Sequence, residues 1–278
     1  MTILLNERDS LIIYLQKLKE NKFKVSNHND LKNYSTLMLK YIGDKDPVLR
    51  DDLIYIAFNK WISKFKYFSE EELLNILSIS LDKEHLFFKI GNTQDDSVFT
   101  RSFSVLIVCL ILERHRERPF LSESLFIDVK NALLEYYAKE NDLRGYVENY
   151  GWAHSAAHGA DGFFEIVLSK ECDEELCISI MDSIKNKLFN GYYIFHDEED
   201  ERMVDVVNMI YTRKLISRER FETWLLFLVK CLSEFTEFKK YICRVNIKNF
   251  MRSLYFKTRN LEYDEELVDY IFNLAKEI

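Results

Sequence analysis

The sequence has little glycine and proline, only 7 and 2 among 278 residues. These residues form many of the tight turns that β-sandwiches and β-barrels need in large numbers. Their scarcity argues against an all-β fold and favours long helices joined by short polar loops. The hydrophobic share of 47% and the charged share of 30% are those of a globular chain that can bury a sizeable core.

Long apolar runs of the kind that membrane insertion or secretion requires are also missing. The longest mainly apolar stretch, residues 103–112, has about half the length of a bilayer span. Residues 1–5 are followed at once by polar residues 6–9, which leaves no apolar core for a signal peptide. The five cysteines are odd in number and form no Cys-x-x-Cys pair, which is typical of small buried residues in a reducing compartment. We therefore expect a cytoplasmic protein without membrane association.

Acidic residues outnumber basic ones by 46 to 38, and the net charge is -8. Such a chain as a whole repels nucleic-acid backbones and anionic membranes. One segment differs, because residues 239–259 contain seven basic residues and no acidic one. Four of them recur every four residues: Lys240, Arg244, Lys248 and Arg252. This basic stripe is typical of a solvated helix face. Nucleic-acid binding is the alternative, and the negative net charge of the chain argues against it.

Apolar residues recur at steps of three and four almost throughout the chain, which is the period of an amphipathic helix. Ser69 and Glu72 have the spacing of a capping box and predict a helix start. Four further residues precede helical patterns in the same way: Ser122, Asp173, Ser217 and Asp264. We expect about a dozen helices and no convincing strand, so the predicted fold class is all-α.

Helix starts recur at intervals of about fifty residues, which suggests an internal repeat. They begin near Asp46, Asp96, Gly151 and Asp200. The pattern resembles HEAT-type repeats and predicts an α-solenoid of paired antiparallel helices, in which neighbouring pairs stack because one pair cannot bury its apolar side alone. A non-repetitive helical bundle is the alternative.

The sequence contains no linker rich in proline, glycine or serine, so we expect a single all-helical domain over residues 1–278. Within it we expect irregular helices to about residue 45, core repeats over residues 46–232 and C-terminal helices over residues 233–278. Stacked helix pairs create extended concave surfaces. The predicted partner is therefore a protein or a small ligand held in a concave groove.

One segment, residues 140–161, departs from the ordinary helical pattern and holds two of the six histidines. On a helix that begins near Gly151, four side chains would share one face: His154, His158, Asp161 and Glu165. Two imidazoles one turn apart can ligate a divalent metal, with Asp161 as a further ligand or as a partner of a histidine. Glu140 or Asp142 would complete the shell, and the metal would activate water for hydrolysis.

Two other interpretations fit the same segment. In the first, which we favour, His154 and His158 form hydrogen bonds across a tight helix interface beside a polar network of Asp142, Arg144 and Asp161. In the second, the histidines line a ligand pocket without a metal. The sequence has no phosphate-binding glycine loop, no Gly-x-Ser-x-Gly elbow and no dinucleotide fingerprint, and it leaves open whether the protein is an enzyme.

The same segment carries a family resemblance, to the bacterial family catalogued as domain of unknown function 2785. The resemblance rests on residues 142–146, 151–161 and 96–104 and, more weakly, 199–202. It extends from about Asp46 to the helix after Arg202. Gly162 and Phe163 follow Asp161 where members of the family usually have leucine, a difference that bears on packing more than on chemistry.

The resemblance implies a bacterial cytoplasmic helical protein without an assigned activity. It also implies that the shared residues form one centre: Arg101, Arg144, His154, His158 and Asp161. The candidate binding residues are Arg101, Arg144, Trp152, His154 and His158. The catalytic candidates are His154, His158, Asp161, Glu140 and Asp142, and a divalent metal would bind His154, His158 and Asp161. The leading functional hypothesis is a binding scaffold, and the alternatives are a metal-dependent hydrolase and nucleic-acid binding through the basic C-terminal helix.

Overall fold

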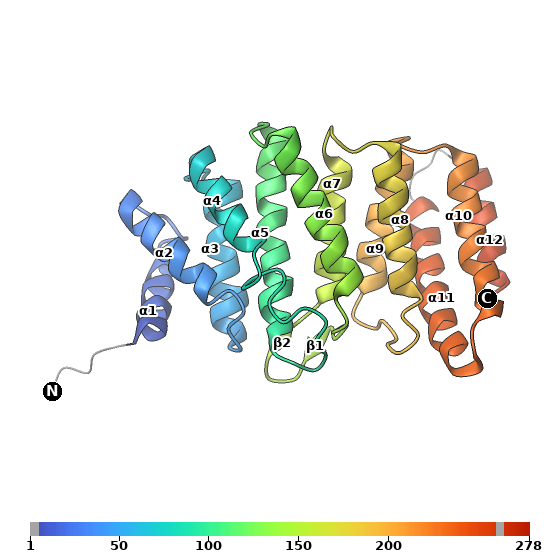
Figure 1. Cartoon of the computed structure of the whole chain (residues 1–278), viewed down its shortest axis with the longest axis horizontal. Coiled ribbons are helices and arrows are strands. Elements are labelled where there is room, and N and C mark those ends of the chain that lie inside the picture. Colours follow the sequence, from blue (N-terminus) through green and yellow to red (C-terminus); the bar gives the residue numbers. More distant parts are fainter. Residues whose placement is uncertain (1–5, 260–263) are drawn as a thin grey trace.

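A computed structural model describes residues 6–259 and 264–278 and shows a predominantly helical chain (Figure 1). These residues form twelve α-helices, two π-helical segments, one 3-10 segment and one hairpin of two very short strands. The predicted all-α fold class is confirmed. Within the same residues, every helix is too short or too polar to cross a membrane.

The elements follow one another along the chain as a long series of helices. The first half contains α1 (Glu7–Glu20), α2 (His28–Lys40), η1 (Val48–Tyr55), α3 (Ile56–Asn59), η2 (Lys60–Lys64), α4 (Glu70–Ser80), α5 (Ser97–Glu117) and α6 (Glu123–Lys139). The second half contains β1 (Tyr146–Val147), β2 (Gly151–Trp152), α7 (Ser155–Leu168), α8 (Glu174–Leu188), α9 (Glu199–Thr212), α10 (Arg218–Lys230), η3 (Cys231–Glu234), α11 (Glu237–Arg259) and α12 (Glu265–Lys276). η1, α3 and η2 follow without a break and form one rod.

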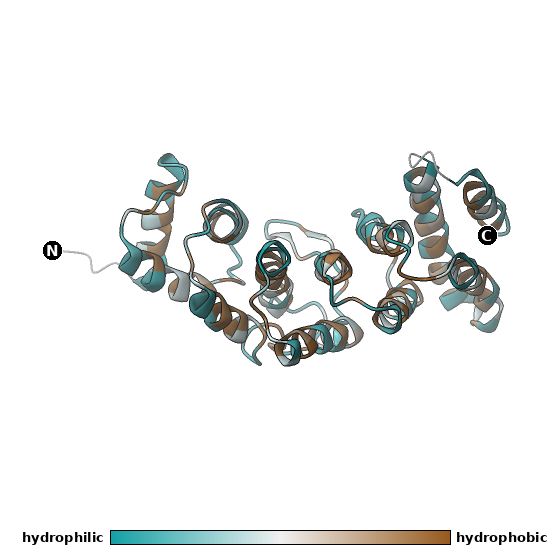
Figure 2. Ribbon diagram, turned by 90° about the horizontal axis from the view of Figure 1, so that it is seen from above, coloured by the Kyte–Doolittle hydropathy of each residue, from teal (hydrophilic) through white to brown (hydrophobic). Residues whose placement is uncertain are grey.

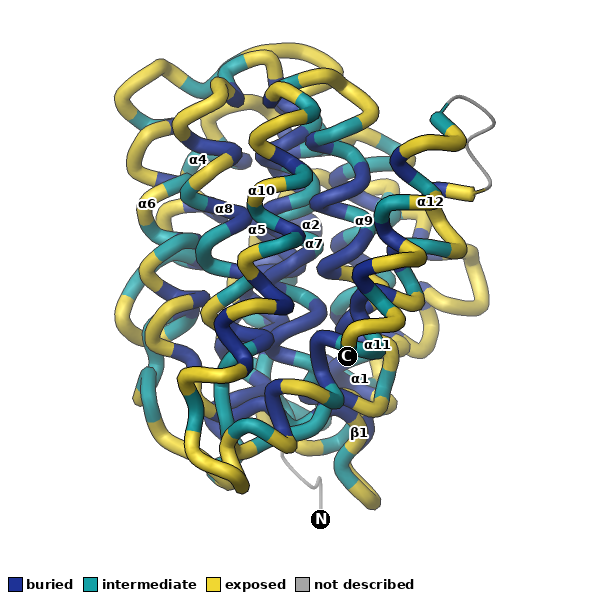
Figure 3. The backbone as a smooth tube through the Cα atoms, turned by 90° about the vertical axis from the view of Figure 1, so that its right-hand side faces the viewer, coloured by how far each residue is buried: buried dark blue, intermediate teal, exposed yellow. Residues whose placement is uncertain are grey.

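The helices are arranged in two rows (Figure 1). The inner row contains the η1–α3–η2 rod, α5, α7, α9 and α11, and in it α7 packs between α5 and α9 while α9 packs against α11. The outer row contains α4, α6, α8 and α10. Figure 2 shows that the array bends into an arc, with the inner row on the concave side. Seen along the array, the buried segments lie in the middle, between the two rows (Figure 3).

The core between the rows explains the apolar run that stands out in the sequence. Residues 103–112 belong to α5, which is buried along most of its length. Ile107, Val108 and Leu112 are fully buried. A helix that is apolar on nearly all sides is buried on nearly all sides, because it packs against neighbours in both rows.

The two edges of the array differ in how the helices are connected. At one edge, three five-residue connectors each end in a residue that caps the next helix: 118–122, 169–173 and 213–217. At the other edge, the connectors are longer and lead into α5, α7 and α9: 81–96, 140–154 and 189–198. The residues directly before these three helices, Asp96, His154 and Glu198, form no capping bond with their side chains. The second edge, the lower one in Figure 1, therefore carries most of the irregular chain.

The capping residues predicted from the sequence are confirmed. Ser69 Oγ accepts a hydrogen bond from the Glu72 amide, and the Glu72 carboxylate accepts one from the Ser69 amide, which completes the capping box. Ser122, Asp173, Ser217 and Asp264 also accept hydrogen bonds from the first turns of their helices.

The start of α7 differs from the prediction. Gly151 and Trp152 pair with β1 in an antiparallel hairpin, and His154 adopts a left-handed backbone conformation with φ 48° and ψ 34°. α7 therefore begins at Ser155. The predicted helix start near Gly151 is wrong, and His154 precedes the helix that carries His158, because the spacing of side chains does not reveal backbone pairing.

Candidate functional site

The structure separates the candidate residues into two neighbouring groups. Arg101, Glu140, Asp142 and Arg144 belong to a polar network between α5 and α6, which we call the sealed network. Trp152, His154 and His158 line a hollow on the inner row. Asp161 lies one helical turn after His158 and is paired with Arg202 from α9, with 3.5 Å between Oδ1 and Nη1.

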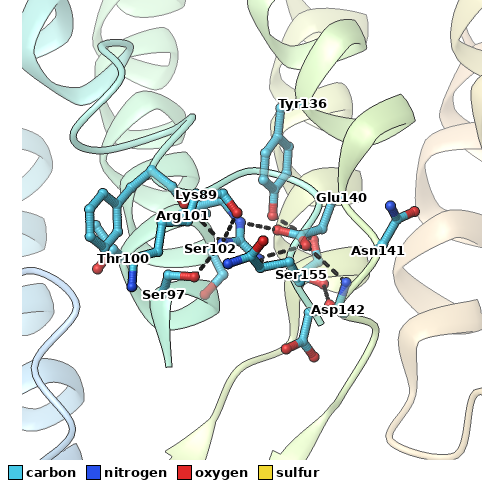
Figure 4. Close-up of polar contacts among 12 residues, drawn as sticks. Lys89, Ser97, Thr100, Arg101, Ser102, Tyr136, Glu140, Asn141, Asp142 and Ser155 are labelled. Atoms are coloured by element: carbon cyan, nitrogen blue, oxygen red, sulfur yellow. Dashed lines mark hydrogen bonds and ion pairs between the residues drawn. The ribbon is translucent and has the colours of Figure 1, made fainter. Parts of the chain in front are cut away.

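The sealed network is centred on a fully buried ion pair (Figure 4). Arg101 donates from Nε to Glu140 Oε2 at 2.6 Å and from Nη2 to Glu140 Oε1 at 2.8 Å. Its remaining nitrogen donates to Ser97 Oγ at 2.7 Å and to the Phe88 carbonyl at 2.9 Å. Bidentate, charge-assisted bonds of this kind are strong and directional. The pair fixes the beginning of the connector 140–154 against α5.

Further charged groups complete this network. Lys187 Nζ donates to the Glu140 carbonyl at 2.8 Å, and burial lowers the pKa of Lys187 to about 8. Arg144 donates from Nε and Nη2 to the two Asp142 oxygens at 2.8 and 2.7 Å. The carboxylates of Glu140 and Asp142 are thus both engaged by guanidinium groups. This arrangement favours structural roles for the two residues over a role as metal ligands or as a catalytic base.

The hollow has a volume of about 550 Å³, within the range of small-ligand pockets. Its walls come from η1, α5, α7 and the connector that leads into α9, so it opens on the concave side of the array. The lining residues are Asp51, Tyr55, Phe103, Leu106, Trp152, His154, His158, His196, Asp197, Glu198 and Arg202.

A continuous series of aromatic rings runs from the outer surface into this hollow. Trp152 is 40% exposed, makes an edge contact with Tyr146 and stacks on His154 with 4.6 Å between ring centroids. The series continues through ring contacts of His154 with His158, of His158 with Phe103 and of Phe103 with Tyr55. We call these six residues the aromatic ladder. It gives the hollow a wall of π-faces and edges that suits flat or cationic groups.

His154 connects the two walls of the hollow. Its Nε2 donates to the Asp197 carbonyl at 2.7 Å, and Oε1 of the buried Glu199 lies 3.9 Å from the same nitrogen. Burial lowers the pKa of His154. The neutral ring therefore attaches the connector 189–198 to the start of α7. His154 and Glu198 both hold left-handed backbone conformations, and strained residues of this kind often occur at functional sites.

His158 lies deeper, against the edge of Phe103. Burial lowers its pKa to about 3, so the imidazole is uncharged at neutral pH. In the described part of the chain, its buried Nδ1 has no hydrogen-bond partner. The same part of the chain contains no group of three or more histidine, cysteine, aspartate or glutamate side chains positioned to hold a metal ion.

Two carboxylates beside the hollow titrate near neutral pH. Burial raises the pKa of Asp51 to about 6, although Arg50 Nε lies 2.7 Å from its Oδ1. Burial also raises the pKa of Asp161 to about 6. The lining contains three carboxylates, of Asp51, Asp197 and Glu198, against one guanidinium, of Arg202. The pKa values of His154 and His158 are lowered, so these two rings add no positive charge. With Asp51 paired to Arg50, the carboxylates of Asp197 and Glu198 leave the hollow with an excess of negative charge.

Several of these lining residues were missed by reasoning from the sequence, which concentrated on residues 140–161. Asp51, Phe103 and Arg202 all lie in the recurring helix-start segments, about fifty residues apart. Stacked repeats bring equivalent positions side by side. Comparing equivalent positions of those segments with one another was therefore the signal that would have found them.

Comparison with known proteins identifies the family. A family model described as "Protein of unknown function (DUF2785)" matches residues 86–256, more than half of the chain. The match includes the sealed network and most of the hollow, whereas Asp51 and Tyr55 lie outside it. Neither the curated proteins nor the solved structures yield a match. The chain therefore belongs to the DUF2785 family, as the signature around His154 and His158 predicts.

Proposed function

We propose that the protein is a HEAT-like helical-repeat scaffold that holds a segment of a partner protein on its concave face. One observation carries the proposal, namely a hollow of about 550 Å³ on the inner row, bounded by the aromatic ladder. The pairs α5–α6, α7–α8 and α9–α10 support a repeat architecture, because their first helices begin at Ser97, Ser155 and Glu199. We place this function in the bacterial cytoplasm.

The geometry supports binding better than catalysis. Glu140 and Asp142, the candidate bases, are held by Arg101 and Arg144. His154 donates its Nε2 proton to a backbone carbonyl. These contacts stabilise the fold around the hollow and give no support to the metal-dependent hydrolase. Wall residues that are fixed by such contacts form a preorganised binding surface.

The basic stripe on α11 is partly neutralised by acidic neighbours. Lys257 pairs with Asp205 of α9. Arg252 and Lys257 line a second hollow that also contains Glu198, Asp200 and Glu201. Arg252 and Lys257 thus lie among acidic groups, which weakens the positive surface at this end of α11 that nucleic-acid binding would require. These acidic neighbours support a protein segment over nucleic acid as the proposed partner.

An array of immobilised peptides of varied sequence tests the proposal. The wild-type protein should be retained by a subset of peptides, and Trp152→Ala should lose that retention because Trp152 is the exposed ladder residue that lines the hollow. Phe227→Ala is the matched control, since Phe227 is 48% exposed and lies on α10, away from the hollow. Equal retention of wild type and Trp152→Ala, or no retention of the wild type by any peptide, would contradict the proposal.

A further inference from the structure

A second hollow continues the first along the concave face. It has a volume of about 490 Å³ and lies between α9 and α11. His196 and Glu198 line both hollows, so the two hollows adjoin at the connector 189–198, and we call them together the groove. The remaining lining residues of the second hollow are Phe195, Asp200, Glu201, Val204, Asn249, Arg252, Ser253, Phe256 and Lys257. A groove that extends past the first hollow suits a length of chain better than a compact molecule.

The first hollow has the charge and the wall of a site for a cation. Asp51, Asp197 and Glu198 place three carboxylates in its lining, and Arg202 is the single guanidinium there. Arg202 is itself paired with Asp161, and Asp51 is paired with Arg50, which lies outside the lining. Asp197 and Glu198 therefore carry the excess negative charge. A cation that enters the hollow would relieve the excess negative charge.

Trp152 supplies the second element of recognition. One face of its ring stacks on His154, and 40% of the residue is exposed. Tryptophan is the best aromatic partner for a cation placed over its face. A guanidinium group combines the two interactions, because it stacks on aromatic rings and at the same time donates paired hydrogen bonds to a carboxylate.

We propose that the first hollow receives an arginine side chain of the partner segment, while the following residues of that segment lie along the second hollow. This inference rests on the proposed function and specifies its ligand. Phe256 in the lining of the second hollow is 65% exposed, so this hollow offers an apolar side chain to the residue that follows the arginine.

Blocked peptides with a single central arginine followed by leucine test the inference by titration calorimetry at pH 7.5 and low salt. Replacing the arginine by citrulline removes the charge and keeps the shape, and it should weaken binding about tenfold or more. Lysine should bind with intermediate affinity, since an ammonium group forms no bidentate pair. A peptide with glutamate at this position should not bind.

Protein variants locate the site. Asp51→Asn should weaken binding of the arginine peptide about tenfold, and Asp52→Asn should leave it unchanged, because Asp52 is exposed and lies outside the lining. Glu198→Gln is a second test, because it leaves the pair of Asp51 with the buried Arg50 intact. It should also weaken binding. Circular dichroism confirms that each variant is folded.

The outcomes separate the inference from the proposed function. Equal affinity for the arginine and citrulline peptides, or a preference for glutamate, would show that the hollow does not select a cation, while retention on the array would still support a scaffold. Binding of free arginine amide as tightly as the peptide would exclude a segment as the natural occupant. Failure of every peptide, on the array and in solution, would reject both proposals.

Discussion

Glu140 and His154 lie at opposite ends of one connector, yet their surroundings differ. At the Glu140 end, every charged group of the sealed network has a partner of opposite charge or a carbonyl acceptor. At the His154 end, carboxylates have a raised pKa and His158 Nδ1 lacks a partner within the described residues. One signature segment therefore contributes both to a buried polar network that stabilises the fold and to the wall of a candidate binding site.

The difference has a physical cause. Buried charges are stable only when they are paired and hydrogen-bonded, so the sealed network must satisfy each group. A hollow that faces solvent can keep lining carboxylates such as those of Asp197 and Glu198 at a smaller cost, although His158 Nδ1 itself is buried. Such groups are available to a ligand, and functional sites are where a chain departs from complete internal satisfaction.

The largest effect is expected from Glu140→Gln, which breaks the sealed network. The change leaves the Arg101 guanidinium buried without a countercharge, and the free energy of unfolding should fall by about 3–5 kcal/mol in urea denaturation. Glu135→Gln is the control, because Glu135 forms an exposed pair with Lys139 on the same helix. The control should change the free energy by less than about 0.5 kcal/mol. Equal effects of the two variants would show that the sealed network does not stabilise the fold.

Gly159→Ala tests the side of α7 that packs against α6. A Cβ atom at Gly159 would lie 2.4 Å from the Tyr137 ring, so we expect a loss of about 1–3 kcal/mol in the free energy of unfolding. Gly162→Ala is the matched control, since its Cβ would meet only side-chain atoms of Leu133 and Val105, at 3.3 Å or more. Its smaller strain is offset by the better helix propensity of alanine. A harmless Gly159→Ala would contradict the close packing of α6 on α7.

His158→Phe tests the side of α7 that lines the hollow, through the pH dependence of the free energy of unfolding. The folded-state pKa of about 3 lies below the ordinary value of 6.5, so only the unfolded chain takes up this proton when the pH falls through 6.5. The wild type therefore loses stability between pH 7.5 and pH 5. The variant lacks this imidazole and does not show the loss that its protonation causes. Relative to the wild type, the variant should gain about 1–2 kcal/mol on going from pH 7.5 to pH 5. A difference in urea denaturation that is independent of pH would contradict the buried neutral imidazole.

Asp161→Asn gives the smallest expected effect. Its dependence on pH is opposite to that of His158→Phe. The folded-state pKa of about 6 lies above the ordinary 3.8, so the wild type loses stability as the pH rises from about 4 to 6. A pKa rise of this size corresponds to about 3 kcal/mol, but the Asp161 side chain is 28% exposed and solvent screens its charge. The variant should therefore be more stable than the wild type by only about 1 kcal/mol at pH 7.5, and this advantage should disappear near pH 4. Asp128→Asn on the exposed face of α6 is the control, with a change below about 0.5 kcal/mol. An advantage that persists at pH 4 would exclude titration of Asp161 as its cause.

Much of the fold is predictable from local signals. Ser69 with Glu72 places the start of α4, and Ser122, Asp173, Ser217 and Asp264 place four more starts, because a cap and its first turn are neighbours in the chain. The start of α7 is not predictable in this way. It depends on the pairing of Gly151 with Val147 and on the left-handed backbone of His154.

The candidate site is predictable only in part. The signature identifies Trp152, His154 and His158, which do line the hollow. It does not show that Arg101 pairs with Glu140, 39 residues away, or that Asp51 and Arg202 meet the histidines from other helices. These contacts depend on how the helices stack, and apolar periodicity specifies which face is buried but not which neighbour covers it.

The unequal edges of the array have a consequence for how the family can diversify. The connectors 118–122, 169–173 and 213–217 have five residues each and end in a cap, so an insertion there would separate a helix from the residue that starts it. The connectors 140–154 and 189–198 are two to three times longer and supply much of the wall of the hollow. Loops tolerate changes in length and sequence better than the elements they join. Under the proposed function, a change in these two loops would alter the lining of the hollow, and with it the ligand, while the framework of helices stays the same.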